Sequence, residues 1–267
     1  MKIAATIAAL WIFSVSAYSQ DMLARKEIYR VNREAVVQIG VGSNFSGDGF
    51  VVSADGVVVT ANHVVTTRES KFHQYANGIQ VRVVRNGIAT IYPATPIEGD
   101  ISDDQVNFDS VKLKITATGL NHVTLGNWDE IDIGSEVEVL ASFPGPDTLM
   151  LEGPVSGKAA ARSDLGPKPV NTVWFQCPVH NGFSGAPIFS SKGHVIGIVD
   201  TKVFGIAPAL DQLRTEWAGF KGGVRMGNID ISGTFVELIN NLDKNLVSGL
   251  GSGVDIAYAE QQENRRK

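Results

Sequence analysis

The chain has 267 residues, 43% of them hydrophobic, and its 28 glycines and 10 prolines are typical of a folded protein rich in turns. Its formal net charge is −5, and the basic residues form no long run before the short tail at 265–267. A nucleic-acid-binding protein carries a basic stripe, so we expect no nucleic-acid partner. Because Cys177 is the only cysteine, no internal disulfide can form, and the fold must depend on its core.

Residues 1–19 have the form of a signal peptide. Lys2 gives a positive start, residues 3–15 are almost wholly apolar, and small residues then permit cleavage after Ala17 or Ser19. A membrane anchor is the alternative, but the apolar run is shorter than the roughly 20 residues that span a bilayer. We therefore expect an exported protein, periplasmic or secreted, with no stable membrane insertion after cleavage.

Short β-type runs separated by Gly, Pro, Asn and Asp fill the chain from about residue 35 to 201. They are Val36–Val41, Phe50–Val52, Val57–Val59, Ile79–Val84, Val111–Ile115, Val137–Ala141, Val173–Cys177, Pro187–Phe189 and His194–Val199. Asp55-Gly56 and Ser190–Gly193 predict hairpin turns between neighbouring runs. Many short strands with frequent turns predict an all-β sandwich or barrel.

Helical periodicity is clear only near the C-terminus. Apolar residues recur there at spacings of three and four, which predicts a helix over about 233–247 with Ser232 as its N-cap. The segment 209–222 fits either a helix or an insertion loop.

Ser184 is the candidate nucleophile. It lies in Asn181-Gly182-Phe183-Ser184-Gly185-Ala186-Pro187, where small residues allow a tight bend that exposes the hydroxyl. The same bend can direct the amides of Gly182 and Ser184 at one point, as an oxyanion hole requires. Taken alone, the segment also fits an ordinary glycine-rich turn. The nucleophile elbow of α/β-hydrolases is rejected, because it requires Gly at position 186 and a histidine well after the serine.

His63 and Asp109 are the candidate base and its orienting acid. His63 follows the run Val57–Val59 directly, and a histidine at a strand end can meet a serine on another loop. Asp109 comes just before the run Val111–Ile115, from which its carboxylate can fix the imidazole tautomer. A structural histidine and a solvated turn are the alternatives, and Asp103 and Asp104 compete with Asp109 within the same loop.

The remaining reactive side chains receive other assignments. His73 and His122 lie in polar stretches without a motif, and His180 is too near Ser184 along the chain to be its base, although it can line the substrate site. Cys177 lies in an apolar run and is expected to be a buried, inert thiol.

Six motifs in chain order resemble the HtrA/Deg-type trypsin-like serine proteases. They are Gly47–Phe50 with Ala54–Gly56 and Thr60–Val65, Phe108–Leu113, Leu125-Gly126 with Ile133-Gly134, Phe143–Gly145, Gly153–Gly157, and Asn181–Pro187 with Gly193–Ile198. The resemblance covers about residues 33–201, well over half of the chain, and it brings His63, Asp109 and Ser184 into the family order.

The resemblance implies one protease domain over 20–267, built from two packed six-stranded antiparallel β-barrels. The first barrel is expected over about 33–120 and the second over about 121–231, with the helix at 233–247 outside them. The implied function is a serine endopeptidase acting on protein or peptide substrates, with no metal and no cofactor. A catalytically silent binding or scaffold domain and an esterase with the same triad are the alternatives.

The chain departs from the family pattern at two places near the nucleophile. Phe183 replaces a polar residue, so the zymogen switch that uses an Asp at this position in digestive relatives is not expected, and Ala186 replaces Gly. The chain ends about 80 residues after Ser184, so no PDZ domain is expected. The P1 pocket is expected between the stretch before Ser184 and residues 198–203, where Asp200 leaves a preference for Arg or Lys open against a small or apolar P1 residue.

Overall fold

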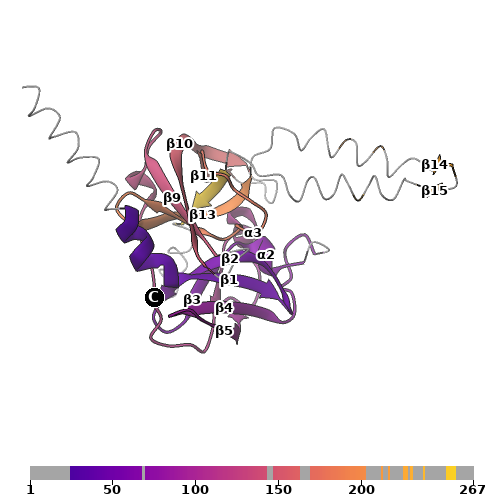
Figure 1. Cartoon of the computed structure of the whole chain (residues 1–267), viewed down its shortest axis with the longest axis horizontal. Coiled ribbons are helices and arrows are strands. Elements are labelled where there is room, and N and C mark those ends of the chain that lie inside the picture. The colour runs from indigo at the N-terminus through magenta and orange to yellow at the C-terminus, as the bar shows by residue number, and fades with distance from the viewer. Residues whose placement is uncertain are drawn as a thin grey trace, which may run out of the picture.

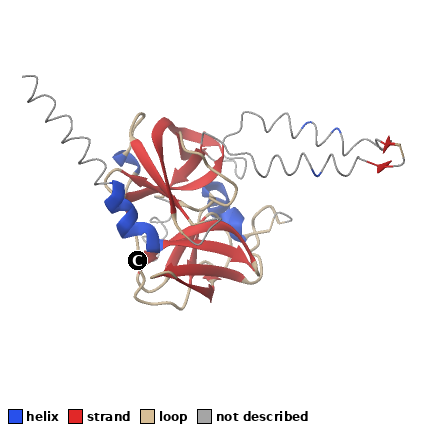
Figure 2. Cartoon of the chain, viewed as in Figure 1, coloured by secondary structure: helices blue, strands red, loops and turns tan. Residues whose placement is uncertain are grey.

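The computed structural model describes residues 25–67, 70–142, 147–162, 169–202 and 251–256, with a few isolated positions between 203 and 250. The expected signal peptide and C-terminal helix therefore lie outside the described residues, apart from single positions, and so does most of segment 209–222. The described chain consists mainly of two β-sheets packed together (Figure 2). No helix within the described residues is both long and apolar enough to cross a membrane.

The first sheet is antiparallel and carries the N-terminal half of the described chain. Its strands are β1 (Val36–Val41), β2 (Asn44–Ser53), β3 (Val57–Thr60), β4 (Ile79–Arg85), β5 (Ile88–Pro93), β6 (Thr95–Pro96) and β7 (Val111–Lys114). They lie in the order β5-β4-β1-β2-β3-β7-β6 and form a half-barrel. Alternate residues of β4 are buried, namely Ile79, Val81 and Val83, and they pack on Ile39 and Leu113 inside this sheet.

The second sheet closes into a barrel. Its strands are β8 (Thr124–Leu125), β9 (Glu136–Ala141), β10 (Leu149–Arg162), β11 (Pro169–Phe175), β12 (Pro187–Ser190), β13 (His194–Lys202) and β16 (Gly251–Asp255). Six of them follow the order β12-β9-β10-β11-β16-β13, and pairing of β12 with β13 completes the ring. The seventh, β8, pairs in parallel with β13. A trypsin-like double barrel is therefore confirmed, with one sheet closed and the other half-closed.

Strand β16 lies beyond residue 231, where the second barrel was expected to end. It pairs with both β11 and β13, so a segment late in the chain completes the ring. Its glycines are required by close packing. A Cβ on Gly253 would lie 2.2 Å from Cδ1 of Ile188, and one on Gly251 would lie 2.6 Å from the ring of Phe175.

A hydrophobic cluster joins the two sheets. Phe50 of β2 and Val59 of β3 belong to it together with Phe189 and Ile198 of the second barrel. Ile28, from a helix over residues 25–32 that lies beside the sheets in Figure 1, completes the same cluster. Because these apolar side chains are buried against one another, the cluster holds the two sheets at a fixed position.

Short helical segments connect the strands. They are η1 (Arg33–Ala35), α2 (Asn62–Val65), α3 (Asp103–Phe108) and η2 (Trp128–Glu130). A separate two-stranded ribbon is formed by β14 (Arg225–Met226) and β15 (Ile229–Asp230). Of these segments, α2 and α3 lie between the sheets; α2 carries His63, and Asp109 follows α3 directly as its C-cap (Figure 1).

Glu138 is an ionisable side chain buried on β9. Its side chain is 1% exposed, its Oε2 has no hydrogen-bond partner among the described residues, and Nε of Arg25 lies 4.0 Å from its Oε1. Burial, reinforced by Glu152 and Glu136 and only partly offset by Arg25, raises the pKa of Glu138 from 4.5 to about 7. The folded protein therefore holds this carboxyl in its neutral form at mildly acidic pH.

Replacing Glu138 by Gln is expected to change the pH dependence of stability. The folded pKa exceeds the unfolded value, so this group's contribution is complete below pH 4.5 and is lost as pH rises to about 7. Without the carboxyl, the free energy of unfolding at pH 8 should rise by up to about 3 kcal/mol, with little change at pH 4.5. Urea unfolding across pH 4–8 measures this. Glu152→Gln, at an exposed partner of Arg25, should change little, and an unchanged slope in Glu138→Gln would contradict the expectation.

Candidate active site

His63 is carried by a single helical turn directly after β3. Two hydrogen bonds of Asn62 fix this turn, α2. The N–H of Asn62 donates to the carbonyl of Asp109 at 3.1 Å, and its carbonyl accepts from Thr66 Oγ1 at 2.8 Å. The side chain of His63 is 27% exposed. The backbone that carries His63 is therefore fixed, and its ring remains accessible to solvent.

Asp109 caps the C-terminus of α3, and its backbone is left-handed with φ 46° and ψ 43°. The helix begins with a capping box, in which Ser102 and Gln105 satisfy each other's backbone N–H groups. At its other end, the N–H of Asp109 donates to the carbonyls of Gln105 and Val106. These bonds fix the direction in which the Asp109 side chain leaves the backbone.

The Asp109 carboxylate is engaged by His63 through both of its oxygens. Oδ1 accepts the backbone N–H of His63 at 2.9 Å, and Oδ2 lies 2.6 Å from the ring Nδ1. Because a carboxylate only accepts, Nδ1 must carry the proton of this bond, which leaves Nε2 as the basic nitrogen. The Asp109 side chain is 1% exposed. Asp103, one of its rivals, is exposed and lies 3.0 Å from His73 Nε2 instead.

Ser184 lies in a loop built on positive backbone angles. Gly182 has φ +104° and Gly185 has φ +88°, a region that favours glycine. The N–H of Phe183 donates to the carbonyl of His180 at 3.1 Å, and the buried Phe183 side chain packs into the core of the second barrel. Ser184 Oγ is 3.5 Å from the carbonyl of Asp200. An apolar residue at 183 thus anchors this loop by packing.

The nucleophile loop contacts the first sheet at β2. The N–H of Asp48 donates to the carbonyl of Ser184 at 2.8 Å, and the Asp48 carbonyl accepts from Thr60 Oγ1 at 2.6 Å. A Cβ on Gly47 would lie 2.7 Å from Val64 and 3.0 Å from the carbonyl of Ser184. The turn that carries His63 and the loop that carries Ser184 therefore pack against the same stretch of β2.

Asp48 lies in the motif Gly47–Phe50, and its buried carboxylate was given no role from the sequence. The residue is fully buried, and its Oδ2 accepts the N–H of Ser142 at 3.0 Å. Gln38 donates to the carbonyl of Ser142 at 2.9 Å and accepts from Arg82 at 3.0 Å. This set of bonds ties β2 and β1 to the end of β9 beside the nucleophile loop.

Asp200 joins the predicted residues from the second barrel. One ring nitrogen of His63, one carboxylate oxygen of Asp109 and one of Asp200 all lie within 4.8 Å of one another. A group of this kind has the donors for a divalent cation, but both Asp109 oxygens already accept N–H groups of His63. The proximity of Asp200 to His63 had no signal in the sequence, from which Asp200 was considered only as a residue of the expected P1 pocket.

Cys177 is buried and free, as expected. Burial, together with the negative charges of Glu136, Glu152 and Glu138, raises the pKa of its thiol to about 12. The thiolate is the reactive form, so this cysteine is not a nucleophile at neutral pH.

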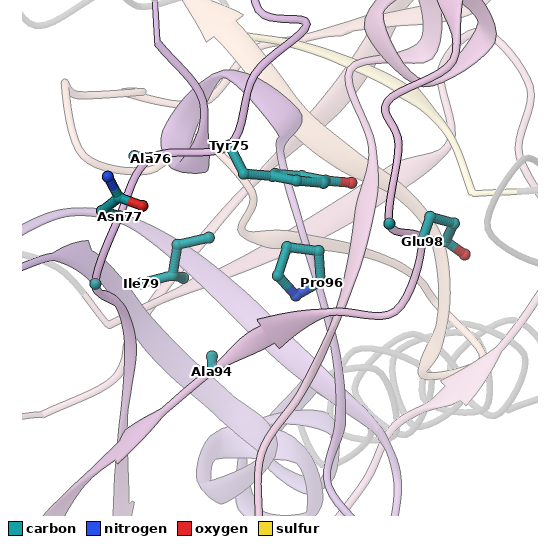
Figure 3. A pocket seen from close by; sticks show the side chains of 9 residues that line it. Tyr75, Ala76, Asn77, Ile79, Ala94, Pro96 and Glu98 are labelled. Atoms are coloured by element: carbon teal, nitrogen blue, oxygen red, sulfur yellow. The ribbon is translucent and has the colours of Figure 1, made fainter.

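A hollow of about 190 Å³ lies at the edge of the first sheet (Figure 3). It is lined by Tyr75, Ala76, Asn77, Gly78, Ile79, Ala94, Pro96, Glu98 and Gly99. None of the predicted site residues lines it. Two lining residues contact the helices beside the site: the Tyr75 hydroxyl accepts a hydrogen bond from Gln105 of α3 at 3.3 Å, and the N–H of Ala76 donates to the carbonyl of Val65 of α2 at 2.9 Å.

Comparison with known proteins gives relatives of one kind. The profile of the trypsin-like peptidase domain matches residues 47–198, more than half of the chain. A putative serine protease HhoA from Synechocystis sp. is 24% identical over 136 residues, covering 48% of this chain and 34% of that protein. A probable periplasmic serine endoprotease, DegP-like, from Ectopseudomonas mendocina is 34% identical over 90 residues, covering 34% of this chain and 19% of that protein. The chain thus spans about a third or less of the length of these relatives.

The solved structure of the HtrA-type protease AlgW with a tripeptide has the same fold. It superposes with a TM-score of 0.59 at 22% identity, covering 89% of this chain and 61% of that one. Together with the profile match over the segment that holds His63, Asp109 and Ser184, this likeness confirms the resemblance to HtrA-type proteases. The chain belongs to the trypsin-like peptidase family.

Proposed function

We propose that the chain is a serine endopeptidase that cleaves protein or peptide substrates through a triad of Ser184, His63 and Asp109. The observation that carries the proposal is the double engagement of Asp109, whose two oxygens accept the backbone N–H and the ring Nδ1–H of His63. A histidine held in this way presents Nε2 as a base in one tautomer, which is the arrangement that peptide-bond hydrolysis by serine requires.

In this mechanism Ser184 Oγ attacks the carbonyl carbon of the scissile bond while His63 Nε2 takes the hydroxyl proton. The imidazolium, stabilised by Asp109, then protonates the leaving amine, and an acyl-enzyme remains on Ser184. Water, deprotonated by His63, attacks the ester and regenerates the free serine. No metal or cofactor takes part in any of these steps.

The N–H groups of Gly182 and Ser184 are proposed to hold the oxyanion. Among the described residues, neither of these two groups donates to another protein group, whereas the N–H of Phe183 between them is bonded to the carbonyl of His180. Two amides without a protein acceptor, on either side of a bonded one, are available to a developing negative charge.

Export is part of the same proposal. The DegP-like relative is named as periplasmic, and residues 1–19 have the charge and apolar pattern of a signal peptide. We infer that the mature chain works outside the cytoplasm.

Covalent labelling tests the activated serine directly. A fluorophosphonate probe, read by intact mass, should label the folded protein once, and Ser184→Ala should abolish the labelling. Ser156→Ala is the matched control, since this hydroxyl only accepts from Gln176 on the outer side of β10, and it should label like the wild type. A folded wild-type protein that stays unlabelled would favour a silent binding domain, and cleavage of small acyl esters but not of casein would favour an esterase.

A further inference from the structure

Asp200 occupies an irregular position in β13. The pairing of β13 with β16 passes from Val199 opposite Gly253 to Thr201 opposite Ser252, so Asp200 is the extra residue of a bulge. A bulge redirects the side chain that it contains and interrupts the alternation of the strand. Here it brings a carboxylate from the second barrel to the His63–Asp109 pair of the first sheet.

We propose that Asp200 is a positioning residue, a second carboxylate that stabilises the protonated form of His63 and so sets the pH above which the base becomes available. The inference rests on the proposed function, because it concerns the proton that His63 accepts from Ser184. It assigns to Asp200 a role at the base, in place of selection for a basic P1 residue.

Charge geometry supports the assignment. Asp109 is already bonded to His63 through both oxygens, so the carboxylate of Asp200 adds a second negative charge within 4.8 Å of the same ring. A negative charge at this distance from an imidazolium, in surroundings that water reaches in part, shifts the titration of the ring by about one pH unit. The effect favours the imidazolium, because a neighbouring carboxylate stabilises the positive form.

The other ionisable groups near His63 are engaged elsewhere. On α3, which packs against α2, Asp103 lies 3.0 Å from His73 at the solvent-exposed end. On β2, the carboxylate of Asp48 accepts from the N–H of Ser142. In the nucleophile loop, His180 Nδ1 lies 2.7 Å from the carbonyl of Asn181. Strand β1, the other element against α2, carries no ionisable side chain.

The carboxylate of Asp200 has two opposing effects on His63: it makes the ring more basic, and it lowers the fraction of the ring that is unprotonated at a given pH. The second carboxylate makes His63 a stronger base and stabilises the imidazolium that forms as Ser184 attacks. It also keeps the ring protonated to a higher pH, where a protonated ring cannot accept the serine proton. The wild-type enzyme should therefore lose activity on acidification earlier than a variant with a neutral residue at 200.

The first measurement is the pH profile of kcat/KM for the wild type and for Asp200→Asn, which keeps the size of the side chain. The acid limb of the variant should lie about one pH unit lower, with Asp103→Asn, an exposed carboxylate, unchanged as the control. An unmoved limb together with a changed preference between Arg and apolar P1 residues would overturn the proposal and return Asp200 to the substrate pocket.

The second measurement does not need activity. In the Ser184→Ala background, the ¹⁵N signals of the His63 ring are titrated with and without Asp200→Asn, and the midpoint should be lower in the double variant. If the protein cleaves no peptide but the midpoint moves, the proposed function fails and the role of Asp200 stands. If the protein is active and the midpoint stays, the role of Asp200 fails. Asp200→Ser serves as a second neutral variant should the Asn variant not fold.

Discussion

Replacing Asp109 by Asn is expected to lower kcat/KM by about 10⁴-fold, which is the effect of removing the orienting acid from a Ser-His-Asp triad. Both oxygens of Asp109 accept N–H groups of one residue, His63. An amide offers one acceptor and one donor, so it cannot serve both groups. In one orientation the amide NH₂ faces the backbone N–H of His63, and that hydrogen bond is lost. In the other orientation the NH₂ faces Nδ1, so the ring proton moves to Nε2 and the ring can no longer accept the proton of Ser184.

The matched control for this variant is Asp103→Asn, six residues earlier on α3, where the side chain is exposed and pairs with His73. It should keep wild-type kcat/KM, because it changes the same charge without touching His63. Steady-state kinetics on one peptide substrate, with circular dichroism to confirm folding, measures both variants. If Asp109→Asn keeps more than about a tenth of wild-type activity, then Asp109 does not orient the base.

The strands that the sequence predicted are apolar runs, either buried almost throughout, as in β1 and β9, or alternating, as in β4. The run Val36–Val41 coincides with β1, and the turn at Asp55-Gly56 separates β2 from β3 as expected. In β4 the alternation of buried and half-buried residues is regular, which is why Ile79–Val84 was visible as a strand. Burial on one face imposes this pattern on the sequence, so it can be detected before the partners are known.

Strands without a buried face gave no such signal. In β5 every residue is exposed or half-buried, so no apolar alternation marks it. The turn before β5 was missed, although Asn-Gly is a strong hairpin signal and Asn86 and Gly87 both have positive φ. In β16 the glycines that allow close packing remove the side chains on which a periodic pattern depends.

The sequence indicated the proposed site residues one at a time but not their arrangement. His63, Asp109 and Ser184 lie in local motifs, whereas the helix before Asp109 was expected to be a turn, although Ser102 and Gln105 form its capping box. Asp200 depends on a bulge whose register is set by β16, a strand about 50 residues away along the chain. Long-range pairing of this kind leaves no trace in the neighbouring sequence.

Replacing Gly185 by Ala is expected to move the nucleophile loop, which carries Ser184, away from the first sheet. A Cβ there would lie 2.1 Å from the carbonyl oxygen of Asp48, 2.6 Å from Thr60 Oγ1 and 2.9 Å from the N–H nitrogen of Ala61. Two of these atoms are backbone of the first sheet and cannot rotate away, so the nucleophile loop must move. We expect the free energy of unfolding to fall by about 3 kcal/mol or more and fluorophosphonate labelling of Ser184 to be lost.

The backbone angle alone does not account for this loss, and a second glycine separates the two causes. Gly87 has φ +75°, close to the +88° of Gly185, but a Cβ at position 87 meets nothing within 4 Å. Gly87→Ala should therefore cost only the strain of a left-handed backbone, about 1–2 kcal/mol, and should keep full labelling. Urea unfolding and the labelling rate compare the two variants. Equal losses of stability with labelling intact in both would mean that contact between Gly185 and β2 does not position Ser184.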